Sequence, residues 1–276
     1  MKALSALSIT SAFDRTKAEI LVGYLDEADL PVLRRSLVFQ GIKLENSPSL
    51  GLIRSTNTYS DFSEDDFYKI VQFKWELLKK AFTLGYDYVI YSDTDVYWNL
   101  DPISEILETF SLHPDTHIQI QSFTDLLSQP KLCMGFVVFR NSEFSVNFID
   151  ECKSLHRKMA IENGRIGDDD LVTQIYRERN FPNWMLELPQ TTFPVGRMLK
   201  LYSKQSKFPG LPSPIPYIFH ANYVVGLRNK IILMKLFISN YSIFDRRTKL
   251  GIKNRSILEL QKIRLLINRT RKGLSR

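Results

Sequence analysis

The chain has 276 residues, of which 44% are apolar, and this is enough for one sizeable hydrophobic core. Its only two cysteines, Cys133 and Cys152, support neither a disulfide framework nor a zinc cluster. The net charge of +7 is concentrated in residues 246–276, which carry eleven lysines or arginines and one acid, so the near-neutral remainder is not expected to bind nucleic acid.

The beginning of the chain is not expected to be a signal peptide. Residues 1–10 are too weakly apolar for a signal peptide, and no run of residues approaches the length that crosses a membrane. We therefore expect a cytoplasmic protein. The first predicted strand covers residues 18–25 and the second covers residues 35–42.

A helix is predicted next, from Ser63–Asp66, which supply a cap and first-turn acids, to about Leu84. Lys74 lies on its apolar face, three residues after Val71 and four before Leu78. Such a lysine either extends along the edge of the apolar stripe towards water or points at a phosphate or an acidic group. Both interpretations remain open from the residues alone.

The most informative segment is an apolar, aromatic strand at Tyr88–Tyr91 that is followed at once by Asp93 and Asp95. Carboxylates at the end of a parallel strand lie where open α/β sheets bind ligands. Their hard oxygen atoms suit Mg²⁺ or Mn²⁺, which could neutralise a diphosphate. Asp-X-Asp alone is a weak signal, because residues 168–170 contain a second copy.

The middle of the chain alternates predicted strands and helices, which favours an α/β fold with a mostly parallel sheet. Strands are predicted at 116–122 and 134–140, the second with Gly135 near its start, where a glycine often marks a close backbone approach. Helices are predicted to begin at Ser104, at Ser142 and at the acids that follow Gly167.

Towards the end, a strand beginning at Trp184 leads into a loop with the motif Phe193-Pro-Val-Gly196. A proline-rich loop at 203–216 could close over an acceptor. His220 ends a short apolar strand, where it is either a packed core histidine or a third ligand for Mn²⁺.

Four motifs in this order resemble the nucleotide-diphospho-sugar transferase family of GT-A glycosyltransferases, grouped with the plant α-xylosyl- and α-galactosyltransferases of family 77. The resemblance covers residues from about 18 to 236. Its motifs are the strand with Asp93-Thr-Asp95 and Asp101-Pro102, the acidic element from Asp169 to Gln174, Leu188-Pro189 with Phe193-Pro-Val-Gly196, and His220-Ala-Asn222 with Gly226 and Lys230. Asp170 stands where the family has a glutamine.

The resemblance implies a GT-A fold, Rossmann-like, over residues 1–245, and metal-dependent transfer of a sugar, often from a UDP-linked donor, with retention. It implies Mn²⁺ (or Mg²⁺) as cofactor and a glycan, glycolipid or protein hydroxyl as acceptor. The implied catalytic residue is Asp169, which would stabilise the cationic sugar. The implied ligands of the metal are Asp93, Asp95 and His220, and the implied donor-binding residues are Tyr24, Lys74, Asp93, Gly135, Asp170 and Lys230.

Two other functions are compatible with parts of this pattern. A phosphatase of the haloacid-dehalogenase type also has a strand followed by Asp-X-Asp, but Tyr97 stands where that class has threonine or valine. A catalytically inactive module that binds a nucleotide sugar is the other alternative. The basic tail, residues 246–276, has apolar and basic residues in one helical segment, which could either contact an anionic membrane surface or pack on the protein.

Overall fold

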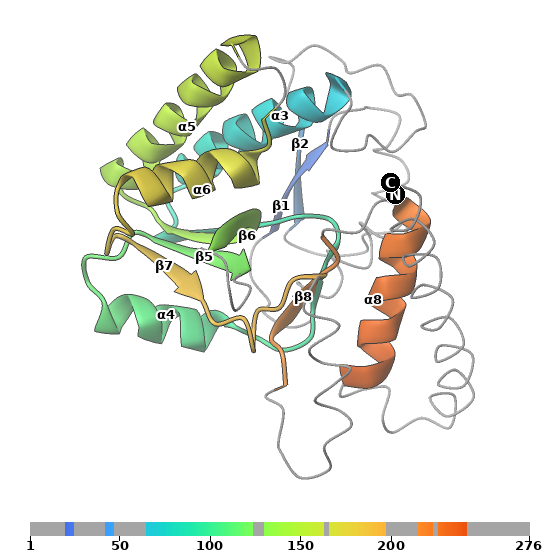
Figure 1. Cartoon of the computed structure of the whole chain (residues 1–276). Helices are drawn as coiled ribbons and strands as arrows, with labels where there is room; N and C mark the ends of the chain where they lie inside the picture. Colours follow the sequence, from blue (N-terminus) through green and yellow to red (C-terminus); the bar gives the residue numbers. More distant parts are fainter. Residues whose placement is uncertain are drawn as a thin grey trace.

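The structure is a computed structural model of the whole chain (Figure 1). Three predicted segments lie outside the residues that it describes. They are the second strand apart from Ile42, most of the proline-rich loop, and the basic tail. The described residues are 20–24, 42–46, 65–123, 130–162, 166–196, 215–222 and 226–241.

The described elements follow the predicted order, with three additions: β2, which shares only Ile42 with the strand predicted at 35–42, the short strand β4 and the long helix α8. They are β1 (Ile20–Tyr24), β2 (Ile42–Asn46), α3 (Asp65–Phe82), β3 (Tyr88–Ser92), β4 (Val96–Trp98), α4 (Ile103–Leu112), β5 (Ile118–Phe123), β6 (Lys131–Arg140), α5 (Glu143–Glu162), α6 (Asp168–Glu178), β7 (Met185–Leu188), β8 (Ile218–His220) and α8 (Leu227–Tyr241).

The central sheet has the strand order β3-β6-β5-β7. β5 and β7 are parallel, whereas β6 runs antiparallel to both of its neighbours. β1 and β2 form a separate parallel pair, and β4 pairs with β8 in an antiparallel ribbon. The predicted α/β fold is thus confirmed, with a sheet that is mixed because β6 reverses direction.

Helices cover both faces of this sheet (Figure 1). α3, α5 and α6 lie on one face, where Trp75, Phe148 and Leu171 pack with Val137 and Phe139 of β6. α4 lies on the other face, where its buried side chains pack with Phe136 and Val138. Successive side chains of β6 thus point alternately into two hydrophobic cores, as expected for a strand that is buried on both faces.

β6 contains an irregularity that matters for the site. Ile120 of β5 pairs with Val137, but the next residue, Gln121, pairs with Cys133, so residues 134–136 have no partner in β5. Met134 packs in the same core as Val137, three residues away, which shows that the alternation shifts here. The backbone atoms of residues 134 and 135 are therefore available to other groups.

α8 packs against the β4–β8 ribbon rather than on the central sheet. The rings of Phe219 and Phe237 stack with centroids 4.3 Å apart, and Tyr97 meets Phe237 edge to face. These contacts hold Phe237, in the second half of α8, against the β4–β8 ribbon. Among the described helices, none is long and apolar enough to cross a membrane.

Candidate functional site

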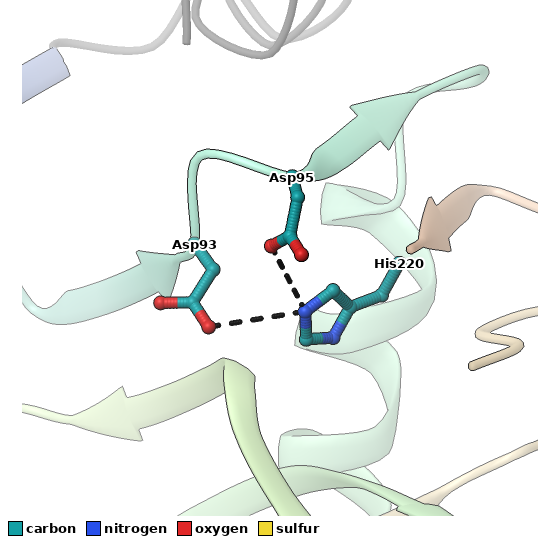
Figure 2. A group of neighbouring side chains, drawn as sticks. All are labelled: Asp93, Asp95 and His220. Atoms are coloured by element: carbon teal, nitrogen blue, oxygen red, sulfur yellow. Dashed lines mark hydrogen bonds and ion pairs between the residues drawn. The ribbon is translucent and has the colours of Figure 1, made fainter. Parts of the chain in front are cut away.

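Asp93, Asp95 and His220 point towards one another at one end of the sheet (Figure 2). His220 Nε2 lies 3.1 Å from Asp95 Oδ1 and 3.8 Å from Asp93 Oδ2. The potential ligand atoms of the three side chains all lie within 4.8 Å of one another. Asp95 and His220 are buried, and Asp93 is half-buried. The structure thus brings together the three residues predicted to hold a metal ion.

Backbone pairing fixes this arrangement. Asp93 and Asp95 flank a tight turn between β3 and β4, in which Val96 N donates to Asp93 O over 3.1 Å. The pairing of β4 with β8 sets Val96 opposite His220, and Ala221 N donates to Asp95 O over 3.0 Å. Val195 forms a bridge to His220. The histidine backbone is therefore held between two segments.

Gly135 makes room for the His220 ring. A Cβ atom added at Gly135 would lie 1.9 Å from His220 Cε1 and 2.7 Å from each ring nitrogen. Gly135 O also accepts a hydrogen bond of 2.8 Å from Asp93 N. The predicted close backbone approach is thus present, and the group that approaches is the imidazole.

Lys74 reaches this group from α3. It is buried, and its Nζ lies 2.5 Å from Asp168 Oδ2, 3.3 Å from Met134 O and 3.6 Å from Asp93 Oδ1. Burial lowers the pKa of Lys74, but the charges of Asp168 and Asp93 outweigh burial and raise it well above its ordinary value. Of the two interpretations of Lys74, the structure favours the one in which it points at the acidic group.

Lys230 approaches from the first turn of α8. Its Nζ donates to Asp95 Oδ2 over 2.7 Å. Gly226, directly before the helix, has a φ of 88°, a backbone conformation that glycine adopts without strain, and its carbonyl accepts from Lys230 N. Burial raises the pKa of Asp95, but His220 and Lys230 hold that pKa below its ordinary value.

The acids that open α6 divide between different partners. Asp168 pairs with Lys74, whereas Asp169 Oδ1 accepts from Met134 N over 2.6 Å at the irregularity in β6. Asp170 pairs with Lys131 at the half-exposed surface. Burial and the negative charge of Asp168 raise the pKa of Asp169 from 3.8 to about 7.

This pKa predicts a dependence of stability on pH in metal-free protein. The native pKa of Asp169 exceeds its unfolded value, so its carboxyl contributes stability below the unfolded pKa that is lost as pH rises through about 7. Wild type should therefore lose stability relative to Asp169→Asn as pH rises from acidic to slightly alkaline values. Denaturant unfolding at a series of pH values measures this difference. Asp170→Asn, which keeps Asp169, should follow wild type, and identical profiles for wild type and Asp169→Asn would contradict the expectation.

Asp168 was missed as a site residue, because three consecutive acids at a helix start look alike in sequence and only the fold selects the one that meets Lys74.

Tyr24 is the last residue of β1, and its side chain is outside the described part of the chain. Its predicted contact with the base stays a prediction.

The side chains present fit a divalent cation of the Mg²⁺ or Mn²⁺ type. Two carboxylates and one imidazole offer hard oxygen atoms and a borderline nitrogen within one small volume. The described carboxylates around it, those of Asp93, Asp95, Asp168 and Asp169, outnumber the ammonium groups of Lys74 and Lys230. A cation would reduce the repulsion among these carboxylates.

Comparisons with known proteins identify the family and the fold. The model of the nucleotide-diphospho-sugar transferase family matches residues 19–234. Among solved structures, mouse xyloside xylosyltransferase 1 is similar with a TM-score of 0.52 and 16% identity, over 80% of this chain and 92% of that one. No curated protein sequence matches.

Two further structures have the same fold. The galactosyltransferase LgtC, solved with donor and acceptor sugar analogues, has a TM-score of 0.53 and 11% identity, over 85% of this chain and 91% of that one. Glycosyltransferase GlyE of Streptococcus pneumoniae TIGR4 has a TM-score of 0.50 and 15% identity, over 88% of this chain but 58% of that one. At these identities the likeness shows the GT-A fold.

Proposed function

Since the chain belongs to the nucleotide-diphospho-sugar transferase family and is a GT-A glycosyltransferase, we propose that it transfers a sugar from a UDP-linked donor to a hydroxyl of a glycan, glycolipid or protein, with retention of configuration. The observation that carries this proposal is the convergence of Asp93, Asp95 and His220 beside two lysines. Because the chain belongs to this family, a phosphatase is no longer needed to explain the strand followed by Asp-X-Asp.

In this proposal Asp93, Asp95 and His220 hold Mn²⁺ or Mg²⁺. When bound, the ion supplies positive charge that stabilises the diphosphate as it leaves the sugar. Asp95 would be the central ligand, since its second oxygen is already oriented by Lys230. Asp93 is fixed from two sides, because Tyr91 OH donates to its Oδ1 over 2.7 Å and its backbone N donates to Gly135 O.

The two lysines would act differently on the donor. Lys230, half-buried at the start of a helix, can move from Asp95 to a phosphate oxygen and place a positive charge where negative charge develops. Lys74 is buried and held by Asp168 and Met134 O, so it is suited to fix the positions of the acids rather than to follow the substrate.

Departure of the nucleotide leaves an oxocarbenium-like sugar, which an adjacent carboxylate can stabilise. We assign this role to Asp169, because Met134 N orients its Oδ1 and its carboxyl lies close enough to Lys74 for that charge to act on its pKa. For retention, the acceptor hydroxyl either attacks from the leaving-group side and gives its proton to the departing phosphate oxygen, or displaces a transient glycosyl ester of Asp169.

The proposal is tested by thermal unfolding of purified protein with UDP, GDP or ADP, each with and without Mn²⁺. We expect UDP to stabilise the protein only when Mn²⁺ is present, by about 2.7 kcal/mol at a hundred times its dissociation constant. Stabilisation by GDP or ADP instead of UDP would identify a different base in the donor but would still support the proposed metal and nucleotide site. No stabilisation by any nucleotide with metal would contradict the proposed function, and it would also contradict the inactive module that binds a nucleotide sugar.

A further inference from the structure

The second ring nitrogen of His220 has a partner that the sequence motifs do not include. His220 Nδ1 lies 3.0 Å from Oε1 of Gln121, a fully buried residue of β5. Nδ1 is also 3.5 Å from Cys133 Sγ, a weaker partner. The ring nitrogen that faces Asp93 and Asp95 is Nε2, so Gln121 lies on the opposite side of the imidazole from the proposed metal.

The orientation of the Gln121 amide is determined by its other end. Gln121 Nε2 donates to Phe193 O over 3.0 Å and to Pro194 O over 2.9 Å. Backbone carbonyls only accept hydrogen bonds, so the atom that meets both of them must be the NH₂ group. The atom that faces His220 is consequently the carbonyl oxygen of the amide, which also only accepts.

This orientation determines which nitrogen of His220 carries the proton. Nδ1 must donate to Gln121 Oε1, so a neutral imidazole has its lone pair on Nε2. That lone pair faces Asp95 Oδ1 at 3.1 Å and Asp93 Oδ2 at 3.8 Å, which are themselves acceptors. Three electron pairs directed at one point call for a cation between them.

The segment Phe193–Gly196 supports the same region at a second point. Gly196 N donates to Asn222 Oδ1 over 2.9 Å, and Asn222 Nδ2 donates to Cys133 Sγ over 2.9 Å. A Cβ atom at Gly196 would lie 2.1 Å from Asn222 O, so only glycine fits against this backbone. The segment therefore holds both Gln121 and the residues that follow β8.

We propose that Gln121 is a positioning residue for the metal site, and that the Phe193 and Pro194 carbonyls, acting through its amide, hold His220 in the form protonated at Nδ1 with Nε2 directed at the metal. This inference rests on the proposed function only in taking the cation to be the one that binds the donor. A partner on the second nitrogen of a metal-binding histidine commonly fixes its proton and its ring orientation.

The first experiment uses metal-free protein. Nitrogen NMR of isotope-labelled histidine distinguishes a protonated from an unprotonated ring nitrogen, and the chain has only four histidines, so His220→Gln assigns the signal. We expect His220 of wild type to carry its proton on Nδ1 at pH 8. Gln121→Leu, which removes the acceptor, should lose this preference.

The second experiment measures Mn²⁺ affinity by titration calorimetry, without any nucleotide. Gln121→Leu should weaken Mn²⁺ binding roughly 10- to 100-fold. Gln119→Leu is the matched control, because Gln119 is also buried in β5 and donates to a backbone carbonyl, Ile106 O, on a different part of the fold. It should bind Mn²⁺ like wild type.

The outcomes separate this inference from the proposed function. A His220 protonated on Nε2 in wild type, or unchanged Mn²⁺ affinity in Gln121→Leu, would overturn it. Losses of affinity that are equal in Gln121→Leu and Gln119→Leu, in proportion to lost stability, would show a merely structural role and overturn it too. Correct protonation and Mn²⁺ binding without any nucleotide response would uphold the role of Gln121 while refuting the proposed function.

Discussion

Replacing Gly135 with alanine is expected to abolish Mn²⁺ binding and to destabilise the protein. The new methyl group would occupy the space of the His220 ring, 1.9 Å from Cε1, and neither partner can move easily. The ring is fully enclosed, and its backbone is held by Val96 and Val195. Overpacking of this kind costs roughly 1–3 kcal/mol. Denaturant unfolding and Mn²⁺ titration measure the two effects.

A double-mutant cycle identifies the cause. In a His220→Ala background the imidazole is absent, so Gly135→Ala should cost little further stability, while metal binding stays weak in both variants. If Gly135→Ala destabilises equally with and without the imidazole, the collision with His220 is not the reason. If Gly135→Ala alone binds Mn²⁺ normally, His220 is not a ligand in the assigned position.

Much of the site could be predicted from sequence because its chemistry lies in short, contiguous motifs. Asp93 and Asp95 follow a strand with clear apolar character, and the structure places them with His220 as expected. Lys230 is likewise at hydrogen-bond distance from Asp95. For Asp93, Asp95 and His220 the local pattern, the end of a strand, also decides where the side chain points, whereas the helix that carries Lys230 was not predicted.

The parts that could not be predicted depend on long-range pairing. β4 has three residues and is a strand only because β8 pairs with it. The irregularity in β6 follows from the register against β5, which turns Met134 and Gly135 towards the site. In the sequence, Gln121 is simply one polar residue of a strand that alternates polar and apolar residues. Its role becomes visible only in the folded structure, where its amide contacts the carbonyls of Phe193 and Pro194.

Replacing Asp95 with asparagine is expected to remove most of the transferase activity. Asparagine keeps the shape and one oxygen atom but loses the charge that His220 and Lys230 face. Removal of one group that stabilises a developing charge commonly lowers kcat roughly 10²- to 10³-fold, and loss of a metal ligand should reach at least that. Asp150→Asn, which breaks a surface ion pair with Lys79, is the control and should keep wild-type activity.

The most direct test of the site is paramagnetic resonance of Mn²⁺ bound to wild type and to Asp95→Asn, with and without UDP. We predict that Mn²⁺ in wild type couples to one imidazole nitrogen, that added UDP introduces a coupling from the same ion to phosphorus, and that Asp95→Asn shows neither at the same metal concentration. Mn²⁺ bound without an imidazole nitrogen, or UDP bound without contact to the ion, would contradict the assignment of Asp93, Asp95 and His220 as the metal site of a nucleotide-sugar transferase.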